Sequence, residues 1–168
     1  MGISAPTPLT DEHPIKSFHC GSEALDTWLT KQALKSQKRG TARVYVVNDA
    51  ETHRVIGYYA IAMGSVSRAQ AFSSLRRNSP DPIPMVILAR LGVDDAYHGQ
   101  GIAAGLLKDC VVRSLKAMSA VGGAGILVHA IDDRAQTFYK KFGFKESTFD
   151  PLVLMARICD IEESLSRD

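Results

Sequence analysis

A glycine-rich stretch in the second half of the sequence, His98–Ala103, has the residue types of an anion-binding turn. It follows the apolar run Met85–Val93 and precedes a segment whose apolar residues recur with helical spacing. Glycines at a strand-to-helix turn let backbone N–H groups converge on an anion, and the helix N-terminus adds unpaired donors and partial positive charge. The residues therefore predict a pyrophosphate site. The alternative is a turn that uses glycine only to change direction.

The spacing of the glycines narrows the class of phosphate ligand. A Walker turn requires Gly-Lys-Ser/Thr after four intervening residues, and the Lys and Ser/Thr are missing here. A dinucleotide turn places its glycines as G-x-G-x-x-G, a pattern that Gly99, Gly101 and Gly105 miss by one position. Neither of these two phosphate-binding turns is therefore expected.

Candidate acid–base residues lie further along the chain. Tyr139 falls beside Phe138 and Phe142 in a helical pattern, and periodicity alone favours a core aromatic. His129, which ends a strand-like run, is a candidate general base, with a hydrogen-bonded strand histidine as the alternative. An α-amine, with a pKa of about 8, needs less help from a base than a lysine side chain with a pKa of about 10.4. If an amine is the nucleophile, the lack of an obvious base therefore favours an α-amine over a lysine side chain.

Basic residues gather between Asp26 and Asp49, where the sequence has no acidic residue. Such a run is usually the solvated face of a helix, and the alternative is a surface that binds phosphates. Arg90 interrupts an otherwise apolar strand, so it either pairs with a buried carboxylate or lines a functional groove. The basic run contains Lys31, Lys35, Lys38, Arg39 and Arg43.

The expected elements place these residues in one α/β domain over 1–168, with a mixed central sheet of six to seven strands flanked by helices. Helices are predicted over 22–38, 101–118 and 133–141, with Ser22 as a cap and with Gly40 and Gly143 as stops. Strands are predicted over Arg43–Asn48, Val55–Met63, Met85–Val93, Ile126–Ile131, Phe144–Thr148 and Leu152–Ile158.

The composition is typical of a soluble globular protein, with 45% apolar and 23% charged residues and a net charge of only +2. No apolar run approaches the roughly 18 residues that cross a bilayer, and no basic segment leads into an apolar one near the start. Cys20, Cys110 and Cys159 are odd in number and form no C-x-x-C pair, which argues against a disulfide framework and a zinc site. A cytoplasmic protein without a membrane association is expected.

The turn resembles that of the GNAT acetyltransferase superfamily, which reads Gln/Arg-x-x-Gly-x-Gly/Ala. Gly101 and Ala103 match this pattern, and His98 stands where Gln or Arg is usual. The later segment Ala135–Phe144 reads A-x-x-F-Y-x-x-F-G-F and is similar to the second signature of that superfamily. The resemblance implies the GNAT fold and acetyl-CoA as a co-substrate, with no metal.

The same resemblance implies roles for individual residues. The family's catalytic tyrosine falls on Tyr139, whose hydroxyl would donate a hydrogen bond as charge develops on the thioester sulfur. The residues implied in acetyl-CoA binding are Leu91, Gly92, Val93, His98, Gly99, Gln100, Gly101, Ile102, Ala103 and Phe142.

A closer resemblance spans nearly the whole chain. Leu9–Thr10, Phe18–Gly21 before a Leu-x-x-Trp-Leu helix, Val55–Tyr59 and Arg90–Val93 are similar to the GNAT toxins of bacterial toxin–antitoxin pairs. This resemblance implies acetylation of the α-amine of aminoacyl-tRNA, a block of translation, a homodimer, and an antitoxin with a ribbon-helix-helix domain. The residues expected to contact the tRNA are Arg90, Lys31, Lys35, Lys38, Arg39, Arg76 and Arg77.

Two other functions stay open on the sequence. One is a GNAT enzyme that acetylates a small-molecule amine or a protein N-terminus. The other is a CoA-binding module without catalysis, or a regulatory partner. Tyr139 weighs against the second, because a pure binding module would not need its hydroxyl.

Overall fold

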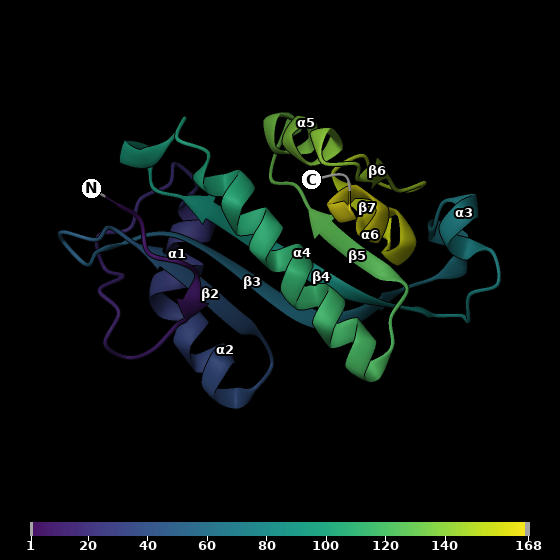
Figure 1. The fold of residues 1–168 in the computed structure, drawn as a ribbon, viewed down its shortest axis with the longest axis horizontal. Coiled ribbons are helices and arrows are strands. Elements are labelled where there is room, and N and C mark those ends of the chain that lie inside the picture. The colour runs from purple at the N-terminus through teal and green to yellow at the C-terminus, as the bar shows by residue number, and fades with distance from the viewer. Residues whose placement is uncertain (1, 167–168) are drawn as a thin grey trace. The chain divides into compact units, whose positions relative to one another are not determined.

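A computed structural model describes residues 2–166, which form a mixed seven-stranded sheet flanked by helices (Figure 1). The strand order is β1-β2-β3-β4-β5-β7-β6, with β4 parallel to β5 and antiparallel pairing at β1–β2, β2–β3, β5–β7 and β6–β7. The strands are β1 Thr7–Pro8, β2 Arg43–Asn48, β3 Val55–Val66, β4 Ile83–Val93, β5 Gly125–His129, β6 Lys145–Glu146 and β7 Val153–Arg157. The helices are α1 Glu23–Lys31, α2 Ala33–Arg39, α3 Ser73–Arg76, α4 Ile102–Val121, α5 Asp133–Lys141 and α6 Ile158–Ser166, with 3-10 turns η1 Arg68–Gln70 and η2 Asp95–Tyr97. The predicted mixed α/β sheet is confirmed.

The chain forms two compact units. The first contains the described residues up to Ala62 together with Ala89–Cys110. The second contains Met63–Leu88 together with the described residues from Val111 onward. The strands β3 and β4 and the helix α4 contribute residues to both units. That residues 1–168 act as one domain stays a prediction.

In the first unit, the single helix predicted over 22–38 is wrong, because two helices meet at Gln32. The side chain of Ser22 caps α1 as predicted, and Gly40 ends α2 in the left-handed conformation with a φ of +80°. Gln32 has a φ of −119°, although the sequence has no proline or glycine there. The second helix, α2, is attached to neighbouring segments through the Gln37 side-chain amide, which donates to the carbonyl of Leu9 and accepts from the N–H of Val44.

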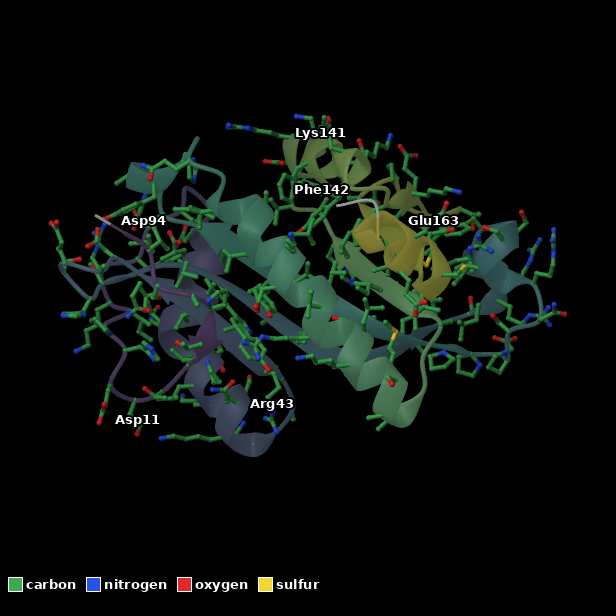
Figure 2. The ribbon with its side chains drawn as sticks, in the orientation of Figure 1. Asp11, Arg43, Asp94, Lys141, Phe142 and Glu163 are labelled. Carbon is green, nitrogen blue, oxygen red and sulfur yellow. The ribbon has the colours of Figure 1, made fainter. Side chains whose placement is uncertain are left out.

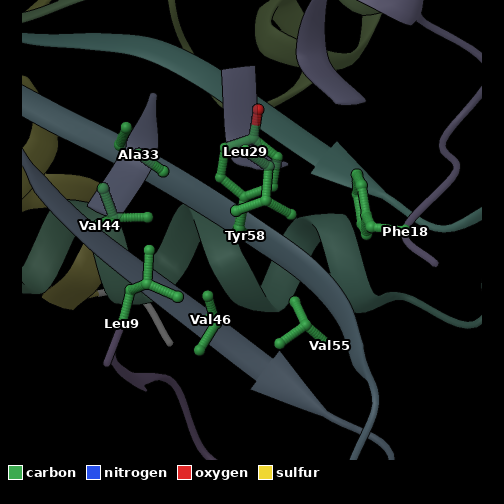
Figure 3. Packing of buried hydrophobic residues seen from close by; sticks show 9 residues of the cluster. Leu9, Phe18, Leu29, Ala33, Val44, Val46, Val55 and Tyr58 are labelled. Atoms are coloured by element: carbon green, nitrogen blue, oxygen red, sulfur yellow. The ribbon is translucent and has the colours of Figure 1, made fainter. Parts of the chain in front are cut away.

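The core of the first unit lies between these helices and the strands β2 and β3. Alternate residues of the two strands point to the same side, so that Val44 pairs with Ala60 and Val46 with Tyr58 in the strand register. Figure 3 shows Leu29 from α1 packed over this face, beside the Tyr58 ring. The cluster comprises Leu9, Phe18, Leu29, Ala33, Val44, Val46, Val55, Tyr58 and Ala60, none of them more than 4% exposed.

The second unit is built on the first part of β4 together with β5, β6 and β7. Met85 of β4 is paired with Gly125 of β5, and Leu127 of β5 with Met155 of β7. Any side chain at Gly125 would meet the carbonyl oxygen of Ala156 at 2.0 Å, which explains the glycine at the start of β5. The helix α6 packs against β5 and β7.

Several predicted boundaries differ from the structure. The strand predicted over Phe144–Thr148 is reduced to β6, because Ser147 turns the chain through bonds to the carbonyl oxygens of Val153 and Asp150. The strand β3 extends past the predicted end at Met63. The long polar connection after it contains two short helical turns, η1 and α3, and β1 was not predicted at all.

Candidate functional site

The chain leaves β4 at Val93, passes through η2 and then the glycine turn, and enters α4 at Ile102. Gly99 and Gly101 have φ values of +80° and +78°, in the left-handed region that glycine adopts readily. The carbonyl of Gly101 accepts a bond from the N–H of Gly105 at 3.1 Å, so Gly101 caps the 20-residue α4. First-turn amides lack partners inside a helix and point out of its N-terminus. This end of α4 can therefore accept an anion such as a pyrophosphate.

The imidazole of His98 is engaged with the strand that precedes the turn. Its Nε2 donates to the backbone carbonyl of Val93 across 2.6 Å, and an oxygen of Asp95 lies 3.8 Å from the same nitrogen. A contact between His98 and a pyrophosphate would thus have to be made by Nδ1, and this contact stays a prediction. The observed bond links the turn to the end of β4, where the pantetheine arm of the donor is expected.

The end of β4 packs closely against the N-terminal segment of the chain. A Cβ at the buried Gly92 would lie 3.4 Å from both Cys20 Sγ and a methyl group of Leu25. Burial raises the pKa of the Cys20 thiol to about 12, so this thiol is neutral and serves packing. Both 3.4 Å distances are those of ordinary van der Waals contact, so β4 packs here against the side chains of Cys20 and Leu25. The roles predicted for Leu91–Val93 in donor binding stay predictions.

Arg90 lines an open groove on the first unit. Its guanidinium carbon lies 4.8 Å from the centre of the Trp28 ring, a cation–π distance. Tyr58 stacks against the same indole at 6.1 Å, with an angle of 9° between the ring planes. Arg90 thus lines a groove, and a functional role for that groove stays a prediction. The groove has a volume of about 530 Å³ and is lined by Glu23, Ala24, Thr27, Trp28, Gln32 and Arg90.

The predicted tRNA-binding residues fall in both units. In the first unit, Lys31, Lys35, Lys38 and Arg39 are all exposed on α1 and α2, and the ammonium of Lys38 lies 3.1 Å from Asp11. The start of β2 adds the exposed Arg43, whose guanidinium reaches the carbonyl of Gln37 at 3.4 Å (Figure 2). In the second unit, Arg76 and Arg77 are exposed at the end of α3. Exposure agrees with either reading, a solvated face or a phosphate-binding surface.

Tyr139 belongs to the second unit, where it lies in α5 and is only 4% exposed. The carboxylate of Asp132 begins this helix by accepting a bond from the N–H of Ala135 at 2.8 Å. The tyrosine ring packs edge-on against Phe138 and Phe144, with centroid distances of 5.3 and 5.9 Å. The aromatic packing fits the core reading, and the catalytic role of the hydroxyl stays a prediction.

Two further candidates of the second unit are exposed. Phe142 ends α5 with 44% of its surface exposed, and its ring lies 5.1 Å from that of Phe138. His129 is exposed at the last position of β5, opposite Val153 of β7. The roles of Phe142 in donor binding and of His129 as a base stay predictions.

Comparison with known proteins decides the family. Residues 40–146 match the model of an acetyltransferase (GNAT) domain. The chain belongs to the GNAT acetyltransferase family. The matched range contains both the glycine turn and Tyr139, so the family prediction made from these two signatures is confirmed.

This acetyltransferase is similar to proteins described as toxins. It is 42% identical over 159 residues to a tRNA-acetylating toxin of Mycobacterium tuberculosis, covering 95% of each chain. It superposes on AtaT complexed with acetyl-methionyl-tRNAfMet with a TM-score of 0.88 and 30% identity, covering 98% and 99% of the two chains. A tyrosine-to-phenylalanine mutant of AtaT, bound to the C-terminus of the antitoxin AtaR and acetyl-CoA, matches with a TM-score of 0.81 and 28% identity over 98% of each chain.

Neither a metal site nor a membrane span is found in the part of the acetyltransferase that the structure describes. Residues 2–166 contain no group of three His, Cys, Asp or Glu side chains that could hold a metal ion. Within the same residues, no helix is both long and apolar enough to cross a bilayer.

The sequence did not reveal the polar contacts that hold the glycine turn of the acetyltransferase in place. Asp94, at the end of β4, is 4% exposed, and its carboxylate accepts a bond from the N–H of Ala96. Tyr97 donates a hydrogen bond to Asp49, 48 positions away in the sequence. The one available signal was an acidic residue directly between a strand and a turn, where Asp and Asn often bond to nearby backbone amides.

Proposed function

We propose that this acetyltransferase transfers the acetyl group of acetyl-CoA to the α-amine of aminoacyl-tRNA. The main support for aminoacyl-tRNA as the acetyl acceptor is the 42% identity with the tRNA-acetylating toxin over 95% of the chain. The similarity to AtaT in complex with acetyl-methionyl-tRNAfMet supports it, because that RNA carries an acetylated aminoacyl group.

The geometry of the glycine turn supports the donor. Two left-handed glycines precede a 20-residue helix, so the turn and the helix N-terminus can offer backbone N–H groups to the pyrophosphate of acetyl-CoA. The AtaT structure that contains acetyl-CoA adds support from a similar chain. The proposed donor contacts are Leu91, Gly92, Val93, His98, Gly99, Gln100, Gly101, Ile102, Ala103 and Phe142.

The reaction needs little proton transfer by the protein. The neutral α-amine attacks the thioester carbon, a C–N bond forms, the C–S bond breaks, and the sulfur leaves with its electron pair. Because an α-amine has a pKa of about 8, a useful fraction of it is already neutral near pH 7. After attack, the nitrogen releases one proton to solvent as the amide forms, and the departing CoA sulfur takes up one proton from solvent. Tyr139 is proposed to donate a hydrogen bond to the sulfur as negative charge develops on it.

The acceptor is proposed to bind through basic side chains of both units. Arginine and lysine contacts to phosphates supply most of the affinity of proteins for nucleic acids, and they make that affinity depend on salt. Arg90, whose guanidinium carbon lies 4.8 Å from the centre of the Trp28 ring, is proposed to contact the 3′ end of the RNA. The other proposed contacts are Lys31, Lys35, Lys38, Arg39, Arg76 and Arg77.

The biological setting follows from the same proposal. Acetylation of the α-amine removes the nucleophile that forms a peptide bond, so the enzyme would inhibit translation and act as a toxin in the cytoplasm. An antitoxin with a ribbon-helix-helix domain is proposed to neutralise it, and the toxin is proposed to be a homodimer. The similar AtaT is seen with the C-terminus of its antitoxin AtaR.

One assay tests the proposal. The protein is incubated with labelled acetyl-CoA and total charged tRNA, with deacylated tRNA as the matched control, and label is measured in the RNA. We expect transfer only to charged tRNA, and we expect Tyr139→Phe to lower kcat by about a hundredfold. Expression of the wild type should arrest growth, and expression of Tyr139→Phe should not.

Other outcomes identify other functions. Label transferred to small amines or to peptide N-termini, but not to charged tRNA, would assign the protein to the alternative GNAT class. Binding of acetyl-CoA without transfer to any acceptor would indicate a non-catalytic module. A Tyr139→Phe variant with full activity would remove the proposed role of the hydroxyl while leaving the acceptor unaffected.

A further inference from the structure

The buried Asp94, labelled in Figure 2, is the first residue after β4 and begins the segment 94–97 that leads into the glycine turn. One of its oxygens accepts a bond from the N–H of Ala96 at 3.0 Å, and the other accepts a bond from the N–H of His19 at 3.2 Å. The guanidinium of Arg54 lies 3.7 Å from the first oxygen. Hydrogen bonds to a carboxylate are strong, so Asp94 joins the backbone of the following turn to that of the N-terminal segment at His19.

The far end of the 3-10 turn η2 is held by the hairpin between β2 and β3. The hydroxyl of Tyr97 donates to the carboxylate of Asp49 at 2.5 Å, and Arg54 lies over the Tyr97 ring at 5.8 Å. Asp49 also accepts bonds from the N–H groups of Glu51 and Thr52. The bond from Tyr97 and these backbone bonds hold the pKa of Asp49 at about 2, so it stays ionised at neutral pH.

The segment 94–97 is therefore attached at both ends, and the glycine turn begins directly after it. A turn with two glycines has unusual conformational freedom, and each conformation would aim its amides differently. Ordering a loop on binding lowers affinity, whereas a preorganised loop avoids that loss. The attachment of residues 94–97 reduces the freedom of the turn before a ligand arrives.

We propose that Asp94 is a positioning residue for the pyrophosphate of the acyl donor. It acts through the turn, without touching the ligand: together with Tyr97 it holds residues 94–97 against the β2–β3 hairpin, so that Gly99 and Gly101 present their backbone in one geometry. This inference rests on the proposed acetyl-CoA site at the same turn.

The test compares two ligands, of which only one carries the pyrophosphate. Binding of CoA and of pantetheine, which lacks the pyrophosphate together with the 3′-phosphoadenosine, is measured by calorimetry for the wild type, Asp94→Asn and Tyr97→Phe. An asparagine offers one acceptor oxygen in place of two and would direct an NH₂ group at a backbone N–H. We expect the Kd for CoA to rise about tenfold in Asp94→Asn and about threefold in Tyr97→Phe, whereas the Kd for pantetheine stays within twofold in both.

A merely structural role gives a different pattern. A variant that is only less stable would lose the same fraction of binding sites for both ligands, without a selective rise in the Kd for CoA. An equal rise in Kd for CoA and pantetheine, or no rise for either, would overturn the proposal. Tyr97→Phe removes one hydroxyl and keeps the ring, so it serves as the test if Asp94→Asn fails to fold.

A control and a separate outcome complete the experiment. Glu12→Gln removes an exposed carboxylate of the first unit and should leave both Kd values unchanged. Because binding is measured without tRNA, a wild type that binds CoA but does not acetylate charged tRNA would overturn the proposed acceptor alone. A wild type that binds CoA no more tightly than pantetheine would overturn both the pyrophosphate site and the role of Asp94.

Discussion

The guanidinium carbon of Arg90 lies 4.8 Å from the centre of the Trp28 ring, and both residues line an open groove. The positive charge of Arg90 therefore lies at a cation–π distance from the indole. A lysine at the same position would keep the charge, but it could not stack in this way.

Replacement of Arg90 should therefore weaken the use of tRNA. We expect Arg90→Ala to raise the KM for charged tRNA about tenfold. If one phosphate contact is lost, the negative slope of log(kcat/KM) against log[salt] should become shallower by about 0.7. Arg90→Lys should keep the salt slope and lose part of the affinity. Lys16→Ala, which removes an exposed charge outside the proposed surface, is the control. A salt slope in Arg90→Ala equal to that of the wild type would exclude a phosphate contact.

A comparison of Gly101 with Gly105 can distinguish the effect of backbone conformation from the effect of steric crowding. Gly101 has a φ of +78°, whereas Gly105 lies within α4, and a Cβ at either position would meet no atom within 4 Å. We expect Gly101→Ala to raise the Kd for acetyl-CoA about tenfold, because an L-residue strains the left-handed turn by about 1 kcal/mol or more. Gly105→Ala should leave the Kd unchanged and stabilise the helix by about 0.5–1 kcal/mol. Calorimetry and urea denaturation check these values, and equal Kd values for the two variants would contradict the role of the turn.

Much of the fold could be predicted because hydrophobic periodicity and the residues that begin or end helices and strands are local properties of the sequence. The helix over Asp133–Lys141 and the strand over Arg43–Asn48 have the bounds that the sequence predicted, and the glycine turn lies where its spacing placed it. The break at Gln32 could not be predicted, since the sequence has no proline or glycine at that position.

The candidate site shows the same division. The glycines and the aromatic signature of α5 are readable in the sequence, because the residue types themselves carry the chemistry. The attachment of the turn is not readable. It depends on the bond between His19 and Asp94, 75 positions apart, and on the bond between Tyr97 and Asp49. The contact of Arg90 with Trp28 could not be predicted either, because it forms only when the fold brings α1 beside β4.

The pair formed by His19 and Asp95 should give a pH-dependent contribution to stability. Their Nδ1 and oxygen atoms lie 2.7 Å apart, and the hydrogen bond and charge of Asp95 raise the pKa of His19. A raised histidine pKa stabilises the fold while the imidazole is protonated, so the contribution is present below a pH of about 6.5 and is lost as the pH rises through the folded-state pKa.

The measurement uses Asp95→Asn. NMR titration should show the His19 pKa falling back towards its ordinary value in this variant. The difference in unfolding free energy between wild type and variant should be largest between about pH 5 and 6.5 and should shrink above that range. An unchanged His19 pKa in Asp95→Asn would show that the pair does not form in solution.

Two buried tyrosines differ in the charge of their acceptors. The hydroxyl of Tyr58 donates to the carbonyl of Leu25 at 2.7 Å, and that of Tyr59 donates to the carboxylate of Asp109 at 2.5 Å, with both tyrosines fully buried. Each Tyr→Phe change keeps the ring and removes one donor. We expect Tyr58→Phe to lower the free energy of unfolding by about 1 kcal/mol, and Tyr59→Phe to lower it by about 2 kcal/mol, because bonds to charged groups contribute more. Urea denaturation with unchanged m-values checks the order, and a larger loss for Tyr58→Phe would contradict it.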